Sequence, residues 1–455
     1  MAATTAYRIA LALALAGSAS MPLPAQYFQQ RNADVRLARF EQQRAEELPS
    51  ESDVLISDAP AQPYHLSLEE AKVRTLQSSP IMDLASLQVS AKCHALRAAR
   101  KDYLPKLLNS FAYFRFDDDL GTVVTTPGIF NPATSIAVPV IEEDSAIYTA
   151  AVIQPITPLF KVREVVNISA ADVGAAEAQR DYARRELLKG VEQLYFGILA
   201  TQQIKAGLEQ AVAGANQMAA ALDSPDAHIT LIEAQQGLLA VEGQLFQLTE
   251  QMNLLVDVPP QTQLELEEPP TPTMPFESAG DAAAAAVASS PKLQEARRQV
   301  DKAEAALRLA HADYVPNVMA YGVYVNQHST EIIQEDFTGV GVSATYLFEW
   351  GKKNDTYRAS KATVALARQS LRKEIQDISL NAAKSYHAAI QAEQALNYAQ
   401  KLANLNQQVR PDSNNPAALK AAMQARLAAE IAAIRAELDY RTARVELRIT
   451  TGVAE

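Results

Sequence analysis

The residues whose types and spacing could support chemistry are few, and each has a simpler interpretation. The segment Gly339-Val340-Gly341-Val342-Ser343-Ala344 matches the loose dinucleotide-binding pattern G-x-G-x-x-A. That pattern binds a pyrophosphate only where a helix opens at the glycines. Here the same residues alternate as those of a β-strand do. A nucleotide cofactor is therefore not expected.

Metal and nucleophilic chemistry have no better support. Cys93 and His94 are adjacent, so on a helix they point to different sides, and the six histidines do not pair as metal ligands would. Asp117, Asp118 and Asp119 could hold calcium, but a solvated loop end is the simpler interpretation. No serine, cysteine or carboxylate belongs to a recognisable catalytic group. We therefore predict no enzyme activity, no metal and no cofactor.

Charge and cysteine content exclude further classes of protein. The net charge is −12, from 53 acidic and 41 basic residues, and lysine and arginine form no stripe that could neutralise phosphates. Nucleic-acid binding is not expected. The single cysteine, Cys93, excludes a disulfide within the chain. We expect it to be a small buried side chain.

The N-terminus predicts export. Within residues 1–25, Arg8 precedes the apolar run Ile9 to Ala16 and then several small residues, the pattern of a cleaved secretory signal. The run is far shorter than the roughly 20 residues of a spanning helix. Residues 26–65 are polar and form an N-terminal arm. Because Cys93 lies far from any cleavage site, we expect no lipid at the N-terminus.

An internal duplication organises the rest of the chain. The run from Pro80 to Pro105 reappears 211 positions later as Pro291 to Pro316. In each copy an alanine-rich helical stretch ends in Asp-Tyr-x-Pro and an alternating aromatic segment follows. We expect helix to pass directly into strand twice, at the junction residues Tyr103, Pro105, Tyr314 and Pro316.

Each repeat is predicted to contain a helix, a β-hairpin, a long rod, a turn and a returning rod. Repeat 1 covers residues 66–256, with a first helix from Ser67 to Arg100, a hairpin at 107–156 and rods at 161–221 and 228–256. Residues 257–290 form a linker. Repeat 2 covers residues 291–455, with a hairpin at 318–348 and rods at 352–408 and 416–449. Matching Leu159-Phe160 with Leu347-Phe348 lowers the offset to 188, which puts 23 extra residues in the loop of the first hairpin.

The rods are predicted to be coiled coils. In the rod at 352–408, apolar residues such as Leu371, Ile375, Ile378 and Ala382 keep a heptad spacing. About 60 helical residues span close to 90 Å, too long for an ordinary globular core. Each rod breaks at a turn, and these tips are candidate adaptor-docking sites: Asp223, Ser224 and Pro225 in repeat 1, and Arg410, Asp412 and Ser413 in repeat 2.

The two hairpins supply four strands of about ten residues, the length of a tilted transmembrane strand. Four strands cannot close a barrel, and an open sheet edge is prohibited in hydrocarbon. Several copies must therefore pool their strands, and three copies of four would give twelve. Candidate membrane-interface aromatics are Tyr113, Tyr148, Tyr324, Tyr346 and Trp350.

From about Leu66 to Gly452 the chain resembles the TolC-type outer-membrane efflux proteins, or outer membrane factors. The resemblance depends on the duplicated order of elements, on Tyr-x-Pro at both junctions, and on Leu-Phe at the end of the second strand of each hairpin. A glycine typically follows that pair, and Gly351 supplies it in repeat 2 while repeat 1 has Arg163. The family's closing pattern is matched at Ala443, Leu447 and Gly452.

The resemblance implies a mostly α-helical fold with membrane β-structure. The protein would be a homotrimer with a shared twelve-stranded β-barrel in the outer membrane of a Gram-negative-type cell, and with a large periplasmic α-barrel. It would contact outer-membrane lipid, a periplasmic adaptor and an inner-membrane transporter, and would conduct substrates passively. The rod ends depart from members that meet an adaptor, because Ala221-Leu222-Asp223-Ser224 and Gln408-Val409-Arg410-Pro411 lack the usual glycine.

Other functions remain open at this point. The duct of a type I protein-secretion system would share the same architecture. A periplasmic coiled-coil adaptor or scaffold would also be exported, helical and duplicated, but should lack strands long enough to span lipid. A periplasmic binding protein or enzyme would need a compact core that such rods do not provide.

Overall fold

The computed structural model describes residues 63–117, 120–126, 134–222, 225–270, 276–328, 334–409 and 416–452. These residues divide into two compact units, each of which takes segments from both repeats. The sheet unit contains His94–Ala170 and Asp301–Val364, and the rod unit contains the described parts of Glu51–Cys93, Ala171–Val300 and Ala365–Glu455. No helix among the described residues is both apolar enough and long enough to cross a bilayer.

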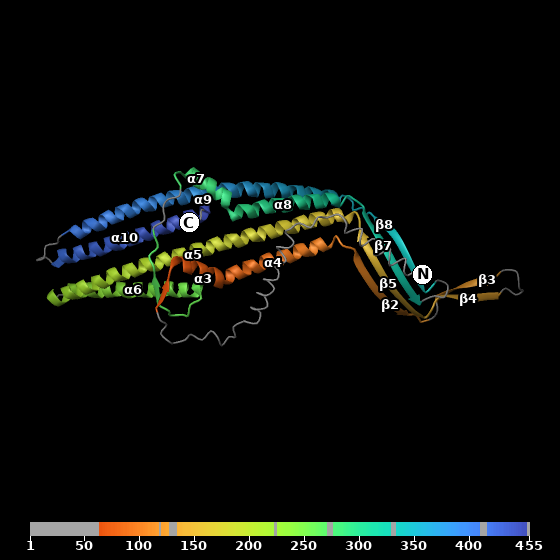
Figure 1. Cartoon of the computed structure of the whole chain (residues 1–455), viewed down its shortest axis with the longest axis horizontal. Coiled ribbons are helices and arrows are strands. Elements are labelled where there is room, and N and C mark those ends of the chain that lie inside the picture. Colours follow the sequence, from red (N-terminus) through yellow and green to blue (C-terminus); the bar gives the residue numbers. More distant parts are fainter. Residues whose placement is uncertain are drawn as a thin grey trace. The chain divides into compact units, whose positions relative to one another are not determined.

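The sheet unit is built on four antiparallel strands: β2 (Lys106–Arg115), β5 (Asp144–Pro155), β7 (Asn317–His328) and β8 (Asp336–Thr345). Their order is β2-β5-β7-β8 (Figure 1). The central pairing, β5 with β7, joins the two repeats and runs from Ala146 opposite His328 to Pro155 opposite Met319. Strands β2 and β8 each have one partner within the described chain, so both edges of this sheet are open.

Each of the four strands is continuous with a helix. Helices α4 (Pro80–Lys101) and α8 (Pro291–Ala312) lead into β2 and β7, and β5 and β8 lead into α5 (Pro158–Leu222) and α9 (Lys352–Gln408). Helices α4 and α8 both end in a tight turn, in which the Tyr103 N–H donates to the Arg100 carbonyl and the Tyr314 N–H to the His311 carbonyl. The prolines two residues later cannot donate to a further helical turn.

The first hairpin differs from the expected loop. Strands β3 (Leu120–Thr126) and β4 (Thr134–Ile141) form a separate antiparallel ribbon in the extra residues of repeat 1. Their sequences are rich in threonine, valine and isoleucine, which favour strands. The expectation of a loop was therefore wrong over these residues.

The Leu-Phe pairs do not end the second strands as expected. Leu159-Phe160 lies in the first turn of α5, and Leu347-Phe348 lies between the end of β8 at Thr345 and the start of α9. Gly351 precedes α9 with a φ of +89°, a conformation that glycine adopts at no steric cost. Repeat 2 therefore has a longer strand-to-helix connection than repeat 1.

In the rod unit, the single helix predicted from Ser67 to Arg100 is two helices. Helix α3 (Leu68–Ser78) ends where the Ser79 N–H donates to the Thr75 carbonyl, and Pro80 then begins α4. A proline fits the first position of a helix but disfavours helical backbone in the residue before it. The break therefore follows from Pro80, which the apolar spacing alone does not reveal.

Repeat 2 contains the same helix pair 211 positions later. Helix α7 (Ala279–Ser289) has 11 residues like α3, and α8 has 22 like α4. Ser67 and Ser278 cap the N-termini of α3 and α7, each accepting a backbone N–H three residues ahead. The second repeat therefore begins near Ser278, and the end of the predicted linker at 257–290 belongs to it.

Two equivalent tyrosines hold these caps. The Tyr195 hydroxyl on α5 donates to the carbonyls of Leu66 (2.9 Å) and Glu267 (2.6 Å), and the Tyr386 hydroxyl on α9 donates to that of Glu277 (2.9 Å). Leu66 and Glu277 each precede a capping serine. The two tyrosines are 191 positions apart, so the rods follow an offset of 191 rather than 188.

The core of the rod unit surrounds Tyr195. It includes Leu66, Val191, Ile198, Met252 and Val256, all nearly inaccessible to solvent. The short parallel strands β1 (Tyr64–Leu66) and β6 (Leu264–Leu266) pack against it. The remaining helices are α6 (Pro225–Val256) and α10 (Pro416–Thr451).

Next to this core lies a buried carboxylate, that of Glu192 on α5. It accepts from Lys72 of α3 at 3.1 Å and from Arg448 of α10. A buried charge is tolerated only when it is paired and hydrogen-bonded. This cluster therefore links three helices of the rod unit.

We expect Tyr195→Phe to lower the free energy of unfolding by about 1–3 kcal/mol, because buried carbonyls would lose their donor. Tyr386→Phe, which frees one carbonyl, should cost less. Burial raises the pKa of Tyr195 from 10.0 to about 12. The neutral phenol therefore contributes fully below pH 10 and its contribution is lost as pH rises through about 12. Denaturant titrations of both variants at neutral and alkaline pH test this, and equal losses would contradict it.

Gly452→Ala should also destabilise the rod unit. Gly452 ends α10 with a φ of +68°, its N–H donates to the Arg448 carbonyl, and an added Cβ would lie 2.7 Å from Cβ of Ser289. We expect a loss of about 1–3 kcal/mol from backbone strain and crowding. The control Gly190→Ala lies within α5 with nothing near its added Cβ, and should gain up to about 1 kcal/mol. Similar thermal unfolding of both variants would argue against this role.

Candidate functional site

The two faces of the sheet differ in composition. The register places Phe111, Tyr148, Asn326 and Asp336 in one row, and the face they share also carries Tyr113, Tyr324, Val340 and Val342. We call this the tyrosine face. The opposite face carries Phe114, Tyr321 and Phe337, but also many small residues, among them Ser110, Ala112, Thr149, Gly341 and Ser343, and we call it the small-residue face. The register thus shows which residues of neighbouring strands share a face. The alternation within a single strand does not show this.

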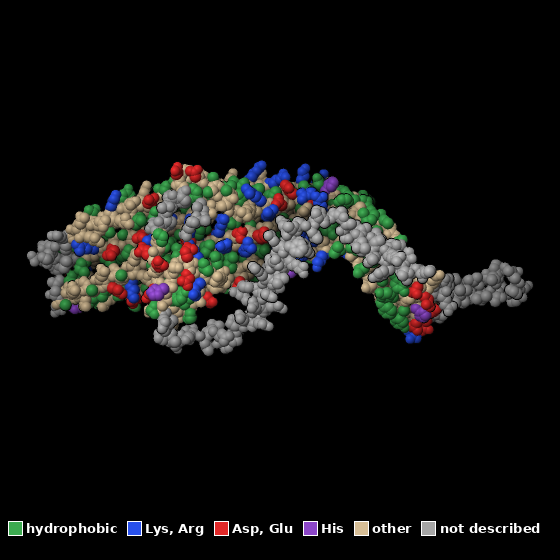
Figure 2. Space-filling view, viewed as in Figure 1, with side chains coloured by type: hydrophobic (Ala, Val, Ile, Leu, Met, Phe, Trp, Pro, Cys, Tyr) green, Lys and Arg blue, Asp and Glu red, His purple; other side chains and the backbone are tan. Residues whose placement is uncertain are grey.

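Burial indicates how the sheet curves. Ser145, Ala151 and Gln327 are at most 9% exposed, and all three belong to the small-residue face. Val340 and Val342 on the tyrosine face are 80% and 67% exposed. Side chains crowd on the inside of a curved sheet and spread on the outside, so the small-residue face is the concave one. Hydrophobic side chains cover much of the visible sheet surface in Figure 2.

Three predicted interface aromatics gather near the loop end of the tyrosine face. The rings of Tyr148 and Tyr324 are 6.4 Å apart, edge to face. The Tyr113 hydroxyl donates to Asp144 at 2.5 Å and the Tyr324 hydroxyl to Asp336 at 2.7 Å. The hydroxyls of Tyr113 and Tyr324 thus bond to carboxylates at the loop end of the sheet, while the Tyr148 hydroxyl donates to the Asn109 side chain at 3.4 Å.

The other two predicted aromatics lie at the helix end, beyond β8. Tyr346 is half exposed and Trp350 is 92% exposed, with the Phe348 ring 5.3 Å from that of Trp350. About 26 Å of extended chain separates Tyr346 from Thr338, the cross-strand partner of Tyr324. On the side of the tyrosine face, exposed aromatic residues therefore occur at two levels, with Val340 and Val342 between them.

The junction in repeat 2 is held by contacts between the repeats, and that in repeat 1 by a contact within its own repeat. The Thr157 hydroxyl at the start of α5 donates to the Pro316 carbonyl at 2.6 Å, and the Val318 N–H donates to the Thr157 hydroxyl at 2.7 Å. At the other junction, the Gln154 side chain donates to the Tyr103 carbonyl at 3.5 Å. Thr157 was missed from the sequence, where a threonine before a proline carries no distinctive signal.

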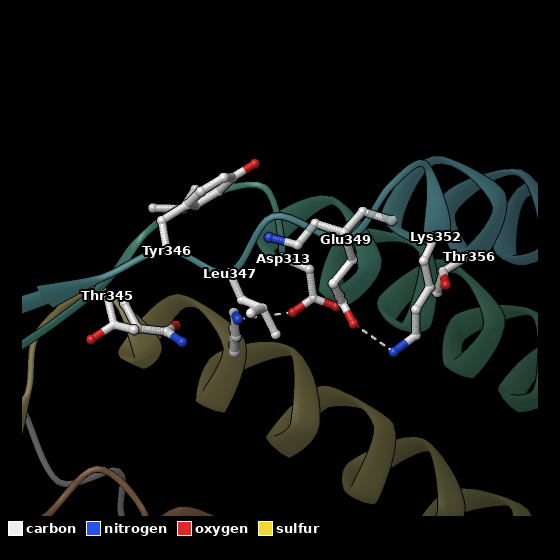
Figure 3. A pocket seen from close by; sticks show the side chains of 11 residues that line it. Asp313, Thr345, Tyr346, Leu347, Glu349, Lys352 and Thr356 are labelled. Carbon is white, nitrogen blue, oxygen red and sulfur yellow. Dashed lines mark hydrogen bonds and ion pairs between the residues drawn. The ribbon is translucent and has the colours of Figure 1, made fainter.

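A pocket of about 340 Å³ lies where β7 and β8 meet their helices (Figure 3). It is lined by two ion pairs, Lys161 with Asp313 at 2.8 Å and Lys352 with Glu349 at 2.6 Å. The hydrogen bond to Glu349 raises the pKa of Lys352, because it stabilises the charged ammonium group. Lys353 lies 4.0 Å from the centre of the Tyr346 ring. The pocket is thus a charged junction rather than an apolar ligand cavity.

The predicted rod tips fall largely outside the described residues. Asp223, Ser224, Arg410, Asp412 and Ser413 lie there, and Pro225 begins α6. Near the second tip, Arg426 of α10 donates to the carbonyls of Asn406 (3.1 Å), Gln407 (3.0 Å) and Val409 (2.8 Å). An arginine near a helix C-terminus donates hydrogen bonds to the last carbonyls, and its positive charge interacts favourably with the negative end of the helix dipole. Because the cap comes from the returning helix, the spacing along α9 could not reveal it.

Cys93 is half-buried rather than buried. Asp118 and Asp119 lie outside the described residues, and Gly339 to Ala344 belong to β8, as their alternation indicated.

No protein-family model matches the chain, and a search of curated proteins gives no match. Solved structures do match. A membrane protein from Pseudomonas aeruginosa is 16% identical with a TM-score of 0.69, and the match covers 85% of this chain and 93% of that one. The outer membrane protein VceC from Vibrio cholerae is 15% identical with a TM-score of 0.66, over 85% of this chain and 96% of VceC.

The MtrE outer membrane channel of Neisseria gonorrhoeae is 14% identical with a TM-score of 0.67, over 85% of this chain and 88% of MtrE. At these identities the matches establish the fold. The chain has the TolC-type outer membrane factor fold, so the fold expected from the resemblance is confirmed.

Thr157→Val should loosen the junction between the repeats, because valine keeps the shape but removes the hydroxyl that bonds to Pro316 and Val318. We expect a loss of about 1–2 kcal/mol in unfolding free energy. Thr157→Ser, which keeps the hydroxyl, should be about as stable as the unmodified protein. Thermal unfolding in detergent measures both, and a valine variant as stable as the serine variant would refute the assigned role.

Proposed function

We propose that this protein is the outer-membrane exit duct of an export system, and that three copies form it. Each copy would contribute its four strands to a twelve-stranded barrel, and its rods would extend the opening as a tunnel through the periplasm. Substrates would pass without chemical change, so no catalytic residue is required. The observation that carries the proposal is a lipid-compatible four-stranded sheet with two open edges.

Open edges are the physical reason for assembly. The outer sides of β2 and β8 carry backbone N–H and C=O groups that in hydrocarbon would each cost several kcal/mol if unpaired. Only closure removes both edges of a sheet. Four strands are too few to close, whereas three copies of four strands give a barrel wide enough for an opening.

The faces of the sheet support an orientation in the membrane. The tyrosine face would meet lipid and the concave small-residue face would line the opening. Aromatic residues at two levels suit the two interfaces of a bilayer, where Tyr and Trp are enriched. The separation of about 26 Å along the strand is similar to the apolar band of about 25 Å in bacterial barrels, and strand tilt would reduce it somewhat.

Partners follow from the family resemblance and from the neighbours described as outer membrane channels. The rod tips, including Pro225 and the turn next to Arg426, would dock a periplasmic adaptor that connects to an inner-membrane transporter. Residues 1–25 would direct export and be removed.

The first test is the oligomeric mass of protein extracted in detergent from fractionated outer membranes. We expect a trimer that resists dissociation in unheated denaturing gels, migrates as a monomer after heating, and conducts ions in planar bilayers. A water-soluble monomer or dimer would instead indicate an adaptor or scaffold. Conductance separates a duct from a trimer that only anchors other proteins.

A further inference from the structure

We infer that α9 of each copy binds α4 and the turn after it in the next copy through two ion pairs, Asp355 with Arg97 and Lys352 with Asp102. This inference rests on the proposed assembly of copies in a ring and adds the residues by which one copy recognises another. The internal duplication supports it, because the chain already contains the equivalent contact between its own two repeats.

Within the sheet unit, α5 of repeat 1 contacts α8 of repeat 2 and the turn that follows α8 through two ion pairs. Lys161 Nζ lies 2.8 Å from the Asp313 carboxylate, and Arg308 Nε lies 2.8 Å from that of Glu164. The Glu164 side chain is only 9% exposed. These pairs lie beside the β5–β7 pairing that joins the two repeats.

The duplication assigns an equivalent to each of the four residues. The offset of 191 along the rods, set by Tyr195 and Tyr386, relates Lys161 to Lys352 and Glu164 to Asp355. The offset of 211 along the preceding helices relates Arg308 to Arg97 and Asp313 to Asp102. All four charges keep their sign. The chain therefore carries a second set of matching charges on α9 and α4.

The order of elements keeps this second set apart within one copy. The strands β2-β5-β7-β8 are continuous with α4, α5, α8 and α9 in that order, so α4 and α9 belong to opposite edges of the sheet (Figure 1). One neighbour of α9 is α8, where the His311 and Tyr357 rings are 6.2 Å apart. When β8 pairs with β2 of the next copy, the next helix beside α9 is α4 of that copy.

The side chains concerned are accessible for such a contact. Asp355 is exposed, and Arg97 is half-buried, with its guanidinium 3.3 Å from Nε2 of His94 on the same helix. The Lys352 and Asp102 side chains are 73% and 49% exposed, and their contacts in the single chain are with nearby residues, Glu349 and Lys106. In the ring, Lys352 would lie between Glu349 and Asp102 of the next copy, at the edge of the charged pocket in Figure 3.

Cross-linking tests the inference. In a full-length Cys93→Ala background, Arg97→Cys and Asp355→Cys are combined, and the detergent-extracted protein is treated with a short bis-maleimide. We expect covalent dimers and trimers on denaturing gels, and a linked peptide with residues 97 and 355 by mass spectrometry. Each single-cysteine variant should stay monomeric on the same gels.

The matched control combines Glu164→Cys with Arg308→Cys in the same background. These positions are the equivalent pair within one chain, so the same reagent should link them without forming oligomers. This control establishes that the reagent spans the contact.

The outcomes separate this inference from the proposed function. If light scattering finds trimers and the control pair links, but residues 97 and 355 stay unlinked, link within one chain or link to another protein, the inference is wrong and the duct survives. If trimers are absent, the proposed function fails first.

Charge reversal gives a second measurement. Arg97→Glu or Asp355→Arg alone should lower the temperature at which the trimer dissociates in detergent, because each places like charges together. The double variant Arg97→Glu/Asp355→Arg should recover most of that loss. A double variant whose loss equals the sum of the single losses would show that the two residues do not meet.

Discussion

The hydrogen-bonding groups along the two edge strands are the constraint on which the rest of this molecule depends. The sheet satisfies its backbone groups internally along β5 and β7, but β2 and β8 each leave one side open. In water such edges are tolerable, whereas in hydrocarbon they are not. The apolar tyrosine face makes hydrocarbon the expected surroundings. Each strand is also continuous with a long helix, so closing the strands into a ring would arrange the rods in a ring as well.

The duplication preserves the contacts that position each short helix on its rod, but it does not preserve the buried ion cluster. Ser67 and Ser278 both cap a helix, and Tyr195 and Tyr386 each bond to the carbonyl before the cap. These contacts fix where each short helix begins relative to its rod. The buried ion cluster is not repeated, because the equivalents of Lys72 and Glu192 are Ala283 and Ala383. Repeat 1 therefore holds its short helix by charge as well as by packing, while repeat 2 uses small side chains such as Ala282 and Ala389.

Much of this fold is predictable from the sequence because its signals are long and periodic. Heptads and prolines locate the rods, and alternating residues ended by turns locate the four strands. The errors have local causes. The helix break before Pro80 depends on one residue, and the end of β8 at Thr345 depends on the connection through Gly351 rather than on the Leu-Phe pattern. The site was harder to predict from the sequence, because Thr157 and Arg426 act through contacts with segments distant in the sequence. The two faces of the sheet became distinct only once the register was known.

In assembly, the paired strand edges would provide stability, and the ion pairs between helices would select the partner. Ion pairs between partly exposed side chains contribute little net stability, since solvent screens them and ordering two long side chains costs entropy. Pairing strand edges in lipid contributes far more, but backbone groups are the same on every strand and do not distinguish partners. Complementary charges do distinguish partners, because a wrong alignment places like charges together. Equivalent charges on α5 with α8 and on α9 with α4 would therefore let one duplicated pattern of charges define both the fold within a copy and the contact between copies.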